Sequence, residues 1–236
     1  MRRTLAVLLL AFFALCSSGC IYLRLLELKR QFAQFDRYFE ADVRDGLKLT
    51  CKTPVLLDED MAFFRLVPES RQRTGVAERW HFHWIKAGLP PTADPRDHEL
   101  TADFIYVEHK LTRVILPERF FAFFPKPLFL ALLRSLGHAE IDRKKRTAHS
   151  TLNEKIDSPD AAPPFTASDL KNMLGAPLEM LPVETRSQWH YRYQAASPDQ
   201  RSGRIDIVFT VDGPTQHVRR IKGTVFDSTV DVSLER

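Results

Sequence analysis

Cysteine is scarce in this chain of 236 residues, and its three cysteines cannot build a disulfide framework. Cys16 and Cys20 lie in the N-terminal apolar region, which leaves only Cys51 in the remainder of the chain. Because Cys51 alternates with apolar residues in 47–51, we interpret it as a buried strand thiol. The chain also has no Cys-x-x-Cys pair of the kind that holds zinc.

Motifs that mark common enzymes are missing as well. There is no glycine-rich phosphate loop, no Gly-x-Ser-x-Gly elbow and no His-Glu-x-x-His pair. His81 and His83 would share one face of a strand, but the other six histidines are scattered, so we expect neither a metal site nor a cofactor. The sequence therefore predicts no catalytic residues and no enzymatic activity.

Charge of one sign is also nearly absent. The chain has 34 Lys and Arg against 30 Asp and Glu, and the excess falls to two when Arg2 and Arg3 are set aside. An excess this small does not indicate binding to nucleic acid or to a membrane through charge alone.

The N-terminus carries an export signal. Arg2 and Arg3 precede the uncharged, mostly apolar run 4–15, and Ser17-Ser18-Gly19-Cys20 follows it. A basic start, an apolar stretch and small residues describe a secretory signal peptide. The cysteine after small residues resembles the lipobox of bacterial lipoproteins, although Ser17 replaces the usual leucine. We expect residues 1–19 to be removed and Cys20 to be lipidated.

An alternative is that 4–23 remains as an uncleaved membrane-spanning helix, since it contains no charged side chain. Both interpretations place the rest of the chain on the same side of the membrane. In enterobacterial lipoproteins an aspartate after the cysteine favours the inner membrane, and here Ile21 follows it. The predicted location is the cell envelope, in the outer membrane and facing the periplasm.

A helix is predicted at 23–40, within an N-terminal tether of residues 20–45. Its apolar residues are spaced three and four apart, as on one face of a helix: Leu25, Leu28, Phe32, Phe35 and Phe39. This face packs on the folded domain or, alternatively, forms a stalk that binds a partner near the membrane.

The most informative pattern is a weak internal repeat at an offset of 109 residues. Asp60, Pro68, Trp80 and His81 recur as Asp169, Pro177, Trp189 and His190. In the second copy, Thr166 and Asp169 predict a helix capping box, and Gly175 predicts the end of that helix. We therefore divide the chain into repeats at 46–117 and 143–236.

The aromatic segments alternate strictly, so each should be a strand with one aromatic face. These faces carry Trp80, Phe82 and Trp84 in the first repeat and Trp189, Tyr191 and Tyr193 in the second. The predicted fold class is α+β, with two tandem helix-on-antiparallel-sheet units, an N-terminal helix and an apolar helical connector at 118–142. The phenylalanine-rich connector is either buried between the units or exposed to lipid or a partner.

The second repeat resembles the BamE lipoprotein domain, also called SmpA or OmlA. The matching residues are Leu174-Gly175-Ala176-Pro177, Trp189-His190-Tyr191 and the strands after Arg204, within 166–226. A degraded copy occupies 58–116. The tandem arrangement is similar to that of the beta-lactamase inhibitor protein, which offers a concave sheet to its partner. The duplication and the long connector depart from the single-domain BamE pattern.

These observations predict a lipid-anchored, non-enzymatic scaffold that binds another envelope protein, with a role in outer-membrane assembly or integrity. Trp80, Trp84, Trp189, Tyr191 and Tyr193 are the expected contact residues, because large aromatic side chains dominate binding energy. One alternative is a periplasmic carrier or sensor of lipid or another apolar ligand. Another is an envelope hydrolase, in which His81, His83 or His190 would lie beside a carboxylate in a cleft.

Overall fold

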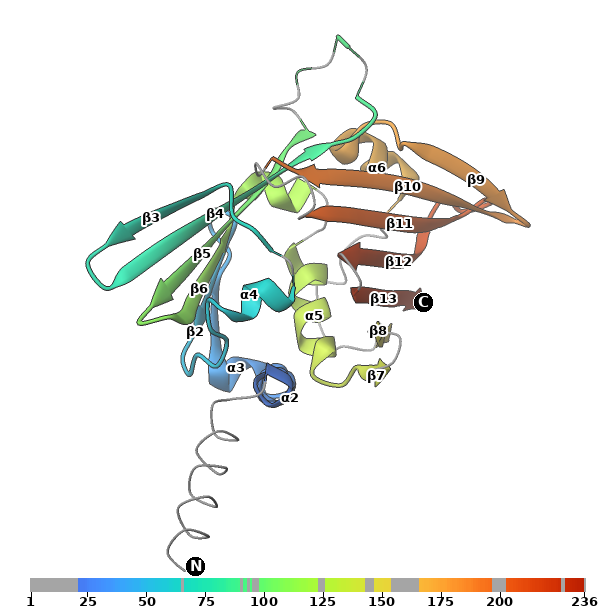
Figure 1. The fold of residues 1–236 in the computed structure, drawn as a ribbon. Helices are drawn as coiled ribbons and strands as arrows, with labels where there is room; N and C mark the ends of the chain where they lie inside the picture. Colours follow the sequence, from blue (N-terminus) through green and yellow to red (C-terminus); the bar gives the residue numbers. More distant parts are fainter. Residues whose placement is uncertain are drawn as a thin grey trace, which may run out of the picture.

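A computed structural model describes residues 21–64, 66–89, 91–92, 94, 98–122, 126–142, 147–153, 166–196, 203–225 and 228–235. Strands dominate this part of the chain, and its helices are short (Figure 1). The helices are α2 (Ile21–Ala33), α3 (Phe35–Tyr38), α4 (Asp60–Phe63), the 3-10 helix η2 (Glu118–Ala122), α5 (Lys126–Leu136) and α6 (Ala167–Leu174).

The strands belong to one sheet. They are β1 (Phe39–Asp42), β2 (Leu47–Cys51), β3 (Ser70–Thr74), β4 (Ala77–Lys86), β5 (Leu100–Val107), β6 (Lys110–Leu116), β7 (Glu140–Asp142), β8 (Thr147–Asn153), β9 (Glu179–Val183), β10 (Arg186–Ala195), β11 (Arg204–Asp212), β12 (Val218–Val225) and β13 (Ser228–Glu235). Their order is β1-β2-β6-β5-β4-β10-β11-β12-β13-β8-β7, with β3 paired to β4 and β9 to β10.

The predicted fold class is therefore wrong. The sequence suggested two separate helix-on-sheet units, whereas the structure has a single 13-stranded sheet with only short helices beside it. Every strand pair in it is antiparallel except β8 with β13. Alternation within a segment identifies a strand and its faces, but it does not reveal which distant strand will pair with its edge. Pairing of strand β4 with strand β10 joins the two halves into one sheet.

The fusion occurs where β4 meets β10. Three pairs form this junction, with Ile85 opposite Gln194 at its centre. Ala87 N–H donates to Arg192 O at 2.8 Å, and Ala196 N–H donates to His83 O at 2.9 Å. In the internal repeat, Ala87 corresponds to Ala196 and His83 corresponds to Arg192, so each of these two bonds is the counterpart of the other. The junction therefore has local twofold pseudosymmetry about its central pair.

The strand registers on either side of the junction correspond. In β3 and β4, Ser70 lies opposite His81, and in β9 and β10, Glu179 lies opposite His190. Both β5–β6 and β11–β12 contain a register irregularity near their turns. We call β3–β6 the first strand set and β9–β12 the second strand set.

The predicted N-terminal helix is shorter than expected. α2 ends at Ala33, and Phe39 already begins strand β1. In α6 the capping box of Thr166 and Asp169 is confirmed: Asp169 N–H donates to the threonine Oγ1 at 3.2 Å, and Thr166 N–H donates to the aspartate at 2.8 Å. α6 ends at Gly175, whose φ of 68° is typical of the glycine that follows the last turn of a helix.

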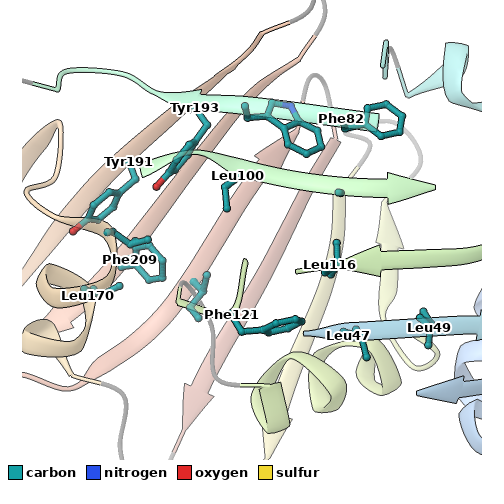
Figure 2. Packing of buried hydrophobic residues seen from close by; sticks show 14 of the residues in the cluster. Leu47, Leu49, Phe82, Leu100, Leu116, Phe121, Leu170, Tyr191, Tyr193 and Phe209 are labelled. Atoms are coloured by element: carbon teal, nitrogen blue, oxygen red, sulfur yellow. The ribbon is translucent and has the colours of Figure 1, made fainter. Parts of the chain in front are cut away.

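A continuous hydrophobic core covers one face of the sheet, which we call the inner face (Figure 2). Every described helix contributes to it or packs against it, including Phe121 from η2 and Leu170 from α6. The opposite face, which we call the outer face, is covered by no helix among the described residues. Helices gathered on a single side of an extended sheet leave one solvated face.

The described part of the connector is packed into this core. Phe120, Phe121 and Phe129 form a cluster of edge-to-face rings with centroids 5.5 to 5.9 Å apart. None of the strongly exposed large apolar residues falls within 118–142, for those whose side chains are described. Residues 123–125 lie outside the described part. The contacts seen match a connector buried under the sheet.

Candidate functional site

The five predicted contact residues all lie on the inner face. The exposed fractions are 5% for Trp80, 7% for Trp84, 5% for Trp189, 1% for Tyr191 and 0% for Tyr193. They therefore do not form the accessible binding surface that the sequence suggested. Their alternation showed correctly that they share a face, but the helices that pack on that face come from elsewhere in the chain.

Two of these aromatic side chains, Trp189 and Tyr191, lie in the core between the sheet and α6. Tyr191 Oη donates to Gly175 O at 3.1 Å, just after the end of α6. Trp189 Nε1 donates to Ser187 Oγ at 2.9 Å. Burial raises the pKa of Tyr191 above its usual range, so the phenol stays neutral. The Leu-Gly-x-Pro and Trp-x-Tyr motifs are thus in contact in the folded chain. This contact gives a structural reason why the two motifs occur together.

Lys86 is buried at the same place, although it comes from the first strand set. Its Nζ donates to Leu174 O and, at 2.6 Å, to Ala176 O, and it lies 5.3 Å from the Tyr191 ring centroid. Burial lowers the pKa of Lys86 below its ordinary value. Carbonyls at a helix C-terminus attract a cation. The amine therefore caps α6 and connects β4 to the second strand set.

The outer face presents polar side chains instead. On β4 these are Arg79, His81 and His83, and on β10 they are Gln188, His190, Arg192 and Gln194. The junction pairs β4 with β10, so the two rows belong to one surface. This outer face is the candidate functional site, because it is the broad surface that no described helix covers.

The first strand set holds its outer side chains in an ionic network. Arg79 Nη2 donates to Asp103 at 2.5 Å, and His81 Nδ1 lies 2.8 Å from the same carboxylate. Burial of Asp103 opposes its ionisation, but hydrogen bonds from Arg79 and His81 outweigh this, and the pKa lies below its usual value. His83 lies 2.9 Å from Glu99 and 3.4 Å from Glu69.

The second strand set repeats this theme with different residues. Arg192 Nε donates to Asp206 at 2.7 Å, and Arg204 donates to the other oxygen of that carboxylate. At the edge of this set, Nε of Arg220 in β12 donates to Asp231 of the neighbouring strand β13 at 2.7 Å. Asp231 is 7% exposed although it belongs to the outer face. These pairs fix long side chains in place, and a surface fixed in this way loses less entropy when it binds a partner.

The histidine–carboxylate pairs meet one condition of the hydrolase alternative. Ser70, His81 and Asp103 even lie in a row across β3, β4 and β5. However, His81 Nε2 has Glu69 at 3.9 Å, and no hydrogen bond joins Ser70 to His81 among the described residues. A nucleophile needs that bond for activation. In the same residues, no group of three or more His, Cys, Asp or Glu could hold a metal ion.

The carboxylates of this network were missed by the sequence analysis. Asp103 interrupts the apolar strand Leu100–Val107 at an alternate position, and this pattern was the available signal that it points to the outer face. Glu69 and Glu99 lie before strands and show no such pattern. Burial raises the pKa of Cys51 to about 11, so that thiol is unreactive.

The predicted lipidation residue, Cys20, and the predicted signal peptide lie outside the described residues. Among the described residues, no helix has both the length and the apolar character needed to cross a membrane. Comparison with known proteins found no matching protein-family model, no matching curated protein and no matching solved structure. The likeness to the BamE domain consequently rests on the motif residues alone.

Proposed function

We propose that this chain is a non-enzymatic scaffold of the bacterial cell envelope, tethered to the outer membrane through Cys20, that binds another envelope protein on its outer face. The observation that carries the proposal is the outer face, which runs across the β4–β10 junction and is covered by none of the helices in the described part of the chain. Its charged side chains are already held by partners within the sheet.

Complementary charge would guide the partner. The exposed side-chain fraction is 52% for Arg79 and 37% for Arg192, so both guanidinium groups remain available to an incoming carboxylate. Pairs of this kind set orientation and association rate more than raw affinity. The expected partner therefore presents acidic side chains opposite Arg79 of β4 and Arg192 of β10.

Position-dependent photo-cross-linking in intact cells tests this proposal. A photoreactive residue at Gln194, which is exposed on the outer face, should capture one defined protein. The matched control is Lys171, which is exposed on α6 on the other side of the sheet. Capture of the same protein at both positions, or of nothing at Gln194, contradicts the proposal.

Charge reversal provides a second measurement. Arg192→Glu should reduce the cross-link from Gln194 by about tenfold, because an exposed charge opposite a complementary partner is replaced by a repelling one. Lys171→Glu changes charge by the same amount away from the outer face and should leave the yield unaltered.

The tether has its own test. Cys20→Ala should abolish metabolic labelling with palmitate and move the protein from the membrane to the soluble fraction. A variant that stays in the membrane fraction without label would instead favour an uncleaved membrane-spanning helix.

A further inference from the structure

The first two turns of α2 expose apolar side chains on one face. The exposed fractions are 50% for Tyr22, 61% for Leu23 and 43% for Leu26. At 100° per residue these three positions lie within an arc of about 100°. Arg30 continues this face and is exposed, with an ion pair to Glu27 at 2.8 Å. The face therefore changes from apolar to basic along the helix.

The opposite side of α2 is firmly attached to the folded domain. Arg24 Nε and Nη2 donate to Asp60 at 2.8 and 2.5 Å, and the Asp60 side chain is 2% exposed. At the edge of the exposed face, the half-exposed Tyr22 packs edge-on against Phe63 of α4, with ring centroids 5.8 Å apart. The exposed apolar face is consequently held in a fixed direction relative to the sheet.

The position of this face in the chain identifies what covers it. Ile21 begins α2, and it directly follows Cys20. The helix rises by about 7.5 Å from Ile21 to Leu26, and one Cα–Cα step of about 3.8 Å separates Ile21 from Cys20, so Leu26 follows Cys20 by about 11 Å along the chain. That distance is comparable to the depth of about 5–10 Å at which interfacial helices bury their apolar faces. Basic residues near such a helix face lie at the level of the lipid phosphates.

We infer that Tyr22, Leu23 and Leu26 insert into the interface of the phospholipid bilayer and orient the whole molecule on the membrane. This inference rests on the proposed tether at Cys20. In Figure 1, α2 lies on the same side of the sheet as α3, α4 and α5. Insertion of this face turns the helical side towards the bilayer and the outer face towards the periplasm, where a partner reaches it.

Lipid photo-cross-linking on the full-length lipidated protein tests the insertion. The protein is reconstituted in vesicles of phosphatidylethanolamine and phosphatidylglycerol, with a benzophenone residue replacing Leu23. The control is the same replacement at Met180, which is 54% exposed on β9, far from α2 in Figure 1. Leu23 should yield phospholipid adducts, detected by their mass, several-fold more often than Met180.

Vesicle flotation of the same samples separates the two proposals. Protein that floats while Leu23 gives no more lipid adduct than Met180 overturns the insertion and leaves the tether intact. A cross-link from Leu23 to a second copy of the chain also overturns it, in favour of self-association. Protein that does not float refutes the tether, and the inference falls with it.

A polar variant checks the role of the apolar face. Leu23→Ser and Leu26→Ser are combined, which leaves the contact of Tyr22 with Phe63 intact, and benzophenone is placed at Arg30. Lipid adducts at Arg30 should fall several-fold while flotation is retained. Because Leu23 and Leu26 are exposed, the far-ultraviolet circular dichroism spectrum should not change, and unchanged adduct formation would contradict the inference.

Discussion

At the residue scale, two corresponding hairpin turns carry different residues at the same positive-φ position. Gly75 in the β3–β4 turn has a φ of 62°, and Glu184 in the β9–β10 turn has a φ of 54°. Glycine adopts positive φ without penalty, whereas a residue with a Cβ is strained there. A Cβ built on Gly75 meets no atom within 4 Å, so only the positive φ of the backbone disfavours a side chain at this position.

Exchanging these residues should move stability in opposite directions. Glu184→Gly is expected to raise the free energy of unfolding, and Gly75→Ala is expected to lower it, each by about 1 kcal/mol. Urea denaturation followed by circular dichroism measures both. A stabilising Gly75→Ala would show that the turn does not keep its positive φ in solution.

His109 offers a pH-dependent test. Its Nδ1 lies 2.7 Å from Asp58, and this hydrogen bond holds the pKa of His109 above the ordinary value. The pair therefore stabilises the folded state below about pH 6.5, and this contribution is lost as pH rises through the folded pKa. Titration of the ring protons by NMR should show the raised pKa, and Asp58→Asn should lower it.

At the element scale, α5 and α2 pack together at a glycine. A Cβ on Gly137, just after α5, would lie 2.1 Å from the Ala33 backbone nitrogen at the end of α2. This close approach requires the absence of a side chain. Gly137 therefore fixes how α2, and with it the apolar face near Cys20, is placed on the core.

Gly137→Ala should lower the free energy of unfolding by about 2 kcal/mol, because the backbone must shift to admit a methyl group. Gly223→Ala in β12 is the matched control, since its Cβ would meet nothing within 4 Å. The control should change stability by less than about 0.5 kcal/mol. Equal effects of the two substitutions would argue against close packing of α2 on α5. Thermal and urea unfolding provide the comparison.

At the scale of the whole molecule, the two strand sets share one sheet and one core. The β4–β10 junction contains only three residue pairs, so side chains must supply much of the connection. Lys86 extends from β4 to the carbonyls at the end of α6. The sets should consequently unfold together in a single transition.

Lys86→Met keeps an unbranched side chain, one atom shorter, and removes its donors. The carbonyls of Leu174 and Ala176 lose this partner, which should cost about 2 kcal/mol of unfolding free energy. Lys48→Met removes an exposed amine from β2 and should stay within about 0.5 kcal/mol of the parent protein. Differential scanning calorimetry would also report whether the variant separates into two transitions. A neutral Lys86→Met would refute its role as a cap.

The sequence predicted local features well. The alternating inward residues of β4 and β10, the capping box of α6 and the helix end at Gly175 are all found in the structure. Each of these depends on neighbours within a few residues, where dihedral preferences and hydrogen bonds act directly. The predicted boundary of the N-terminal helix was wrong because the apolar spacing of three and four continues through Phe35 and Phe39, although α2 ends at Ala33 and these residues belong to α3 and β1.

By itself, the sequence determined which side chains of β4 and β10 share a strand face and where α6 is capped and ends. The export signal and the tether at Cys20 remain predictions from the sequence. Only the tertiary structure decided that the aromatic face is buried, that β4 joins β10 and that Asp103 meets Arg79 and His81. The reason is physical. Local patterns record the conformation of each segment, whereas burial and strand pairing depend on edges and surfaces supplied by segments about a hundred residues away.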